Sequence, residues 1–181
     1  MFVVPVAGGT PVDVMQGMNA DSPSKPFGGP EEYTFTPDGE GVVFTARAAG
    51  REEAWSTSFD LFLAPADGSA TPRNLTSSNK AWDTGPVFSP DGTSLAYRAM
   101  SRPRYESDRF HLVVVRWSDG RELQIAPAWD RSPNEIVWSA DGETIYTTAG
   151  NLGQTSLFAV SVADGSVRTL TGFELGAKVV Q

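Results

Sequence analysis

The sequence predicts an all-β protein made of repeated four-stranded antiparallel sheets, and three observations carry that prediction. The first is a Ser/Thr-x-Asp-Gly turn between apolar segments, which recurs at residues 36–39, 89–92 and 139–142. Asp bonds its own backbone and Gly adopts positive φ, so such a turn closes a β-hairpin. The second is the spacing of roughly 50 residues between copies. The third is an alternating series of Ala/Ser-Asp-Gly turns at 66–68, 118–120 and 163–165. This pattern is typical of β-propeller blades.

The first fifteen residues are interpreted as the last two strands of a blade that lacks its first two. An apolar segment at 1–6 meets two glycines at 8–9, and a second apolar segment follows at 12–14. Residues 17–32 are rich in Gly, Pro and Ser, so they are predicted to form a loop that crosses between blades. The alternative for this loop is an insertion that faces a substrate.

Three complete blades follow, each with apolar segments around its two turns. They are expected at about 33–76, 86–126 and 135–171, and residues 172–181 are expected to begin a further blade. Because known propellers need at least four blades to close a ring, the sequence predicts a partial propeller of about three and a half blades that belongs to a larger one. The unpaired strand edges at its two ends would favour a homo-oligomer.

Composition and charge argue against several classes of function. The 181 residues carry a formal net charge of −8. That charge argues against nucleic acid, because phosphate contacts need a surplus of Lys and Arg, and it disfavours anionic membrane surfaces. There is no cysteine, and no apolar run reaches the length of a membrane span. The chain is expected to be soluble, in either the cytoplasm or the periplasm.

The sequence offers no catalytic centre of its own. It lacks the G-x-S-x-G motif of a nucleophile elbow, and His111 is its one histidine. Neither a Ser-His-Asp triad nor an H-E-x-x-H zinc motif can therefore form within the chain. His111 opens an apolar segment and is interpreted as a packing residue of a strand. No catalytic residue, metal site or cofactor is predicted.

The dipeptide Trp-Asp occurs twice, at 82–83 and 129–130, each time ahead of the first strand of a blade. Because it recurs with the repeat, it is predicted to have a structural role, in which Asp bonds turn amides and Trp packs between blades. It precedes the first strand, so it is not equated with the Trp-Asp dipeptide of WD-repeat propellers.

Two charged loops remain as candidate binding sites. Glu106, Asp108 and Arg109 lie in the connection between the second and third strands of the second blade, and Glu52 and Glu53 lie in the same connection of the first. Such connections share one rim of the disc, where binding surfaces are usually built. A carboxylate pair there could hold a substrate ammonium, and an arginine could orient the pair. The alternative is that these charges pair with neighbours and cap their loops. This interpretation is favoured for both loops, and more strongly for the two glutamates of the first blade.

Two motifs and several shorter segments carry a resemblance to a known family. The motifs are Ala-Trp-Ser-Thr at 54–57 and Met-x-Arg-Pro-x-Tyr-Glu-x-Asp-Arg at 100–109, and the shorter segments are 58–62, 74–76, 82–83 and 88–92. Together they resemble the N-terminal propeller of prolyl-oligopeptidase-family serine peptidases, in the branch of the dipeptidyl peptidases and acylaminoacyl peptidases. The Ser/Thr-Pro-Asp-Gly turns alone are less specific, because TolB-like propellers share them.

The resemblance implies a propeller that covers the active site of a downstream α/β-hydrolase domain, which carries Ser, Asp and His. The propeller would gate and position peptide substrates, and Glu106 and Asp108 would bind the free amino group, with Arg109 orienting them. The parent enzyme would release N-terminal dipeptides or acylated amino acids. Because this chain contains no hydrolase domain, it is not expected to hydrolyse peptides by itself. The alternative is a TolB-like scaffold that binds a protein partner and performs no chemistry.

Overall fold

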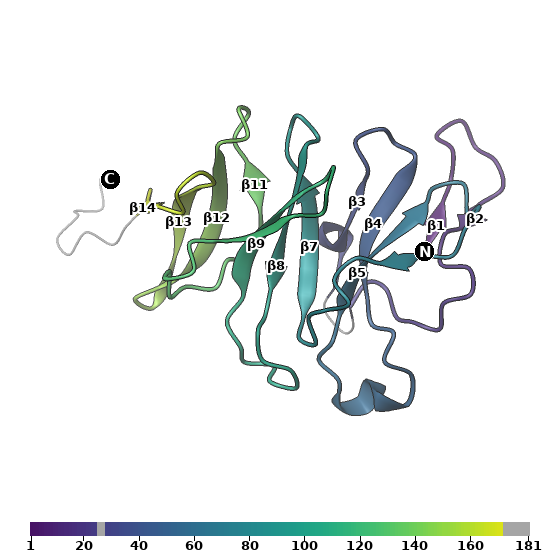
Figure 1. Ribbon diagram of the computed structural model, residues 1–181, viewed down its shortest axis with the longest axis horizontal. Helices are drawn as coiled ribbons and strands as arrows, with labels where there is room; N and C mark the ends of the chain where they lie inside the picture. Colours follow the sequence, from purple (N-terminus) through teal and green to yellow (C-terminus); the bar gives the residue numbers. More distant parts are fainter. Residues whose placement is uncertain (25–27, 172–181) are drawn as a thin grey trace, which may run out of the picture.

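The computed structural model describes residues 1–24 and 28–171, and nearly all of its regular structure is β-strand (Figure 1). The strands form one two-stranded and three four-stranded sheets, and every four-stranded sheet keeps its strands in chain order. Figure 1 shows the sheets side by side along the long axis of the molecule, with β1 near one end and β14 near the other. This arrangement confirms the predicted all-β fold and partial propeller.

The two-stranded sheet at the N-terminus consists of β1 (Phe2–Val3) and β2 (Val12–Asp13). Blade one contains β3 (Tyr33–Phe35), β4 (Gly41–Ala46), β5 (Asp60–Pro65) and β6 (Arg73–Asn74). Blade two contains β7 (Asp83–Phe88), β8 (Ser94–Ala99), β9 (His111–Arg116) and β10 (Glu122–Ile125). Blade three contains β11 (Val137–Trp138), β12 (Thr144–Asn151), β13 (Gln154–Ser161) and β14 (Val167–Thr169).

Two 3-10 helices, η1 (Pro30–Glu32) and η2 (Gly50–Trp55), are the helical segments of the described residues. The helix η1 leads directly into β3, and η2 lies in the connection between β4 and β5. No helix in the described part of the chain is long and apolar enough to cross a membrane.

The strand limits differ from the expected ones at three places. The strand β7 begins at Asp83, ahead of the expected residue 86, because Asp83 and Thr84 already pair with Ala99 and Arg98 of β8. The outer strand β6 is short and ends at Asn74. Past that residue, the Leu61 amide of β5 donates to the side-chain Oγ1 of Thr76 and not to a backbone carbonyl, so the regular pairing of strands stops. In blade three, β12 and β13 continue into a tight hairpin where the other blades have loops. The further blade expected to begin at 172–181 lies outside the described residues.

The Ser/Thr-x-Asp-Gly turns form as predicted, and their side chains explain why. In blade two, Ser89 Oγ donates to Asp91 Oδ1 at 2.6 Å, and the amide of Ser94 donates to Ser89 Oγ at 3.0 Å. Gly92 follows with a φ of +70°. The turns of blades one and three repeat these hydrogen bonds. Each hairpin is therefore closed by residues within six positions of one another.

The apolar cores lie between neighbouring sheets. One cluster joins Val43 and Leu61 of blade one to Leu95 and Val113 of blade two. A second joins the N-terminal segment to blade one, and a third joins blade two to blade three. Because burial of apolar surface is the main driving force of folding, each blade is stabilised chiefly by its neighbours.

Candidate functional site

The connections between the second and third strands of blades one and two, residues 47–59 and 100–110, project from the same edge of the sheets (Figure 1). They contact each other, because the Arg104 amide donates to Thr57 Oγ1 at 2.7 Å and Arg104 Nη2 lies 3.7 Å from Glu52 Oε2. Beside this contact opens a cleft of about 560 Å³, here called the rim cleft. Its charged and hydroxyl lining consists of Glu52, Ser56, Ser58, Asp60, Lys80 and Arg104.

Asp108, one of the predicted amine anchors, holds its own loop together. Its Oδ2 accepts from the backbone amides of Ser101 and Arg102, each at 2.8 Å, and its Oδ1 lies 2.8 Å from Arg102 Nε. Only 8% of the side chain is exposed. Burial acts to raise the pKa of Asp108, but these hydrogen bonds outweigh burial and hold the pKa at about 2. Asp108 is therefore ionised, with both oxygens engaged inside the loop.

Of the other two predicted residues of this loop, Glu106 lies outside that network, whereas a hydrogen bond from the backbone of Arg109 also helps to lower the pKa of Asp108. Glu106 is exposed, and Arg109 is half-buried. Among the described residues, the ion-pair partner of Asp108 is Arg102 and not Arg109. Arg102 also lies over the ring of Tyr105, with its Cζ 4.0 Å from the ring centroid. The loop is thus shaped by Asp108 and Arg102, and it presents Glu106 to solvent.

The two glutamates of the first loop have different partners. Glu53 pairs with Arg47 at 3.0 Å, within its own blade, whereas Glu52 faces Arg104 of the neighbouring blade at 3.7 Å. Exposed ion pairs of this kind contribute only about 0–1 kcal/mol to stability. Glu53 therefore links η2 to Arg47, the residue that follows β4, and Glu52 links the two loops that border the rim cleft.

Asp60 is the half-buried acid of the rim cleft. It was not among the residues predicted from the sequence, because it looks like an ordinary first residue of a strand. Asn74 Nδ2 donates to its Oδ2 at 2.8 Å, while its Oδ1 is buried without a hydrogen-bond partner among the described residues. Burial raises the pKa of Asp60, and the Asn74 hydrogen bond and the charge of Lys80 oppose that rise. Asp60 thus places an incompletely satisfied acid beneath the rim cleft.

The two Trp-Asp dipeptides confirm the predicted packing of tryptophan. Trp82 stacks on Phe59 of blade one, with ring centroids 4.7 Å apart, and meets Phe110 of blade two edge-on at 5.8 Å. Trp129 meets Phe158 of blade three at 5.1 Å and packs against the core between blades two and three. Both indoles therefore fill space between neighbouring sheets.

The prediction for the two aspartates is wrong, because they contact side chains rather than turn amides. Asp83 is fully buried and its Oδ1 accepts from Asn79 Nδ2 at 2.8 Å, while its Oδ2 has no partner among the described residues. Burial raises the pKa of Asp83 to about 7. Asp130 pairs with Arg131 at 2.5 Å, and 79% of its side chain is exposed.

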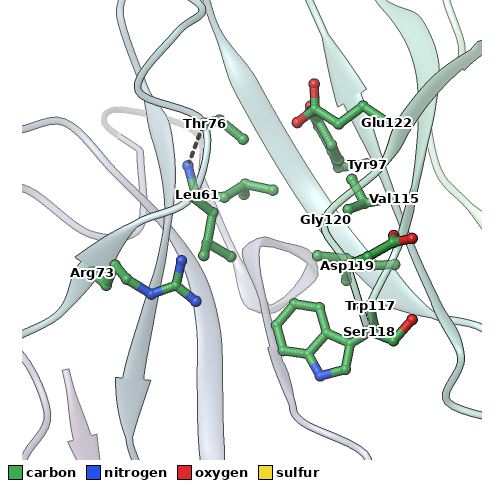
Figure 2. Close-up of a pocket in the computed structure, with 12 residues that line it drawn as sticks. Leu61, Arg73, Thr76, Tyr97, Val115, Trp117, Ser118, Asp119, Gly120 and Glu122 are labelled. Carbon is green, nitrogen blue, oxygen red and sulfur yellow. Dashed lines mark hydrogen bonds between the residues drawn. The ribbon is translucent and has the colours of Figure 1, made fainter.

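A second cleft, here called the side cleft, lies between the outer strands of blades one and two (Figure 2). It has a volume of about 480 Å³. Arg73 approaches from blade one and Trp117 from blade two, and the buried Leu61 forms part of the wall. Tyr97 Oη donates to Glu122 Oε1 at 3.3 Å at the other end. The side cleft therefore has an apolar wall with charges at its margin.

His111 is the half-buried first residue of β9, and burial lowers its pKa. Within residues 1–24 and 28–171, no group of three or more His, Cys, Asp or Glu side chains is placed so that it could hold a metal ion.

Comparison with known proteins gives relatives in sequence and in structure. No protein-family model matches the chain. A dipeptidyl-peptidase 5 of Aspergillus fumigatus is 37% identical over 151 residues, which is 78% of this chain and 21% of the relative. A dipeptidyl-peptidase 5 of Porphyromonas gingivalis is 31% identical over 160 residues, which is 88% of this chain and 23% of the relative. The structure of a putative TolB from Agrobacterium tumefaciens superposes with a TM-score of 0.68 at 20% identity, over 94% of this chain and 54% of that one.

The fold and these likenesses define the chain as a partial propeller of the TolB-like type. In sequence it is a homologue of a segment of the dipeptidyl-peptidase 5 proteins, which confirms the resemblance to the propeller of a peptidase. The chain spans between a fifth and a quarter of the length of these curated relatives.

Proposed function

We propose that this chain is part of the propeller of a serine exopeptidase of the prolyl-oligopeptidase family, in which it gates and positions peptide substrates for an α/β-hydrolase domain. The parent protein releases N-terminal dipeptides. The observation that carries this proposal is the 31–37% identity to dipeptidyl-peptidase 5 proteins over most of the chain. Release of acylated amino acids is the other exopeptidase activity of the branch that the sequence resembles.

The rim cleft and its neighbouring loop are the surface that we assign to the peptide. Glu106 and Glu52 are exposed carboxylates on this rim, and either can accept a substrate ammonium. Asp108 acts as a positioning residue, because its oxygens are engaged in shaping the loop that carries Glu106. Arg109 is half-buried, and its backbone bonds to Asp108, so it helps to hold the loop in place. Fixing the amino end of a peptide sets the distance to the scissile bond, which is what an exopeptidase needs.

The test uses the complete protein and pairs of chromogenic dipeptide substrates, one with a free and one with an acetylated amino group. Glu106→Gln or Glu52→Gln should lower kcat/KM for the free-amino substrate only. A lost charge-assisted hydrogen bond costs about 1.5–3 kcal/mol, or about 10- to 100-fold. The 181-residue chain alone should show no turnover.

Glu40→Gln is a matched control, since Glu40 is exposed in the turn at the opposite edge of blade one. Equal losses on both substrates would remove the amine-anchor role. A complete protein without any peptidase activity would favour the alternative, a TolB-like scaffold that binds a protein partner, as the fold of the Agrobacterium tumefaciens neighbour allows.

A further inference from the structure

A third cavity lies where the first strands of all three blades converge, and it is here called the axial cavity. Its volume is about 350 Å³, within the range of roughly 300–1,000 Å³ that small-molecule sites occupy. Blade one contributes Glu31 and Tyr33, blade two contributes the segment 85–87 and Arg98, and blade three contributes residues 134–136. It is separate from the rim cleft and the side cleft, with which it shares no lining residue.

The backbone of blade two is shaped around Arg98. The pairing of β7 with β8 shifts register between Thr84 and Val87, which marks a β-bulge, and Gly85 within it has a φ of +67°. A Cβ atom on Gly85 would lie 3.1 Å from Arg98 Nε and 3.2 Å from its Nη2. A side chain at this position would therefore crowd the guanidinium, and the positive φ also favours glycine here. Bulges of this kind are frequent next to functional sites, where they redirect a side chain.

Arg98 is a half-buried cation without an ionic partner. Across residues 1–24 and 28–171 it forms no ion pair, and its Cζ lies 5.2 Å from the centroid of the Phe110 ring. Burial lowers the pKa of Arg98, and the charges of Glu32, Glu31 and Glu135 oppose that effect from a distance. An arginine stays protonated at neutral pH, so its guanidinium offers a planar pair of donors for an oxyanion.

The carboxylates near Arg98 differ in the hydrogen bonds that they accept. Glu32 is buried and accepts from the amide of Ser24 at 2.6 Å and from Thr84 Oγ1 at 3.1 Å. Glu135 accepts from the amide and the hydroxyl of Thr148, each at 3.0 Å. Glu31 is exposed at the margin of the cavity. A multiply charged anion such as phosphate would be repelled by these acids, whereas a ligand that carries one carboxylate and one ammonium matches Arg98 and Glu31 together.

We propose that the axial cavity binds a short zwitterionic peptide, with the terminal carboxylate on the guanidinium of Arg98 and the ammonium toward Glu31. The proposal rests on the proposed function, because dipeptides are the products of such an enzyme. A carboxylate takes two parallel hydrogen bonds from arginine, which gives this end of the ligand its orientation. Tyr33, Pro86 and Ile136 supply the apolar part of the lining for the peptide side chains.

The experiment is calorimetric titration of the 181-residue chain with the dipeptide Ala-Leu, its C-terminal amide, N-acetyl-Ala-Leu and inorganic phosphate. Ala-Leu should bind, and the amide should bind at least about tenfold more weakly, the loss expected for one charge-assisted hydrogen bond. The acetylated peptide should be weakened less, and phosphate should not bind. Equal affinity for the acid and the amide, or no binding of Ala-Leu, overturns the proposal.

Variants of residues that line the axial cavity test whether Ala-Leu binds there. Arg98→Lys keeps the charge but loses the planar pair of donors, and Gly85→Ala narrows the space beside Arg98, so each should weaken Ala-Leu about tenfold or more. Arg168→Lys is the matched control, because Arg168 is exposed on the outer strand β14. If a variant unfolds, the wild-type chain is titrated with Ala-Leu and the Nε–H resonance of Arg98 is followed by NMR. A resonance that does not shift overturns the proposal. Failure here leaves the peptidase assay of the complete protein unaffected, so the two proposals fail separately.

Discussion

The two Trp-Asp dipeptides have the same sequence, yet one aspartate is buried and the other is exposed. Asp83 is fully buried at the start of β7, whereas Asp130 is exposed in the connection that precedes β11. Their positions relative to the following turn explain the difference, because Asp83 is the sixth residue before Ser89 and Asp130 is the ninth before Ser139. A dipeptide that recurs therefore indicates equivalent structure only when its distance from the repeating turn recurs too.

The largest expected effect concerns the tryptophans, which in both dipeptides pack between neighbouring blades. Trp82→Ala and Trp129→Ala should each lower the free energy of unfolding by about 3–5 kcal/mol, because each removes a large ring from between two blades. Urea unfolding followed by circular dichroism measures both. Trp82→Phe is the matched control at the first site. It keeps a ring against Phe59 and removes an indole N–H that is buried without a partner among the described residues, so it should cost much less than alanine. Similar costs for Phe and Ala would contradict the stacking role.

The second-largest expected effect is on how the free energy of unfolding depends on pH, which should differ between variants of the two aspartates. Because the pKa of Asp83 is raised to about 7 in the folded chain, its stabilising contribution is complete below pH 3.8 and is lost as pH rises toward 7. Ionisation of this buried acid should cost up to about 4 kcal/mol. The variant Asp83→Asn should therefore gain stability relative to the wild type as pH rises from 4 to 8. Asp130→Asn should follow the wild type across this range. If the stability of the wild type and of Asp83→Asn followed the same course with pH, the raised pKa of the buried Asp83 would be contradicted.

The smallest effect is expected at the exposed aspartate. Asp130→Ala should change the free energy of unfolding by no more than about 0.5 kcal/mol, since an exposed ion pair between sequence neighbours contributes little. Thermal unfolding of the variant beside the wild type measures this. A loss comparable with that of a core residue would show that the two aspartates are equivalent after all.

Local chemistry made most of the fold predictable. The hairpin turns depend on side chains a few residues apart, such as Ser89 with Asp91, so the sequence alone locates them. The early start of β7 and its bulge depend on pairing with Ala99 and Arg98 of β8 and on the space around Arg98. No local sequence pattern predicts those contacts. A glycine inside an apolar strand pattern does suggest a bulge, so Gly85 was the available signal.

The candidate site was predictable only in part. The loop that carries Glu106 could be recognised from its charges, but the engagement of Asp108 by two backbone amides could not be foreseen from spacing. Asp60 and Arg98 look like ordinary strand residues in sequence. Their character comes from burial between blades, which is a property of the assembled sheets.

The rim cleft has one wall on blade one and the other on blade two, and Arg104 ties these walls together. Its width therefore depends on how the two blades, and the loops that they carry, are placed relative to each other. The core between these blades contains Val43 and Leu95, which touch no part of the opening. Changing the volume of those side chains would therefore be expected to alter the spacing of the two loops that border the rim cleft, although neither side chain lines it.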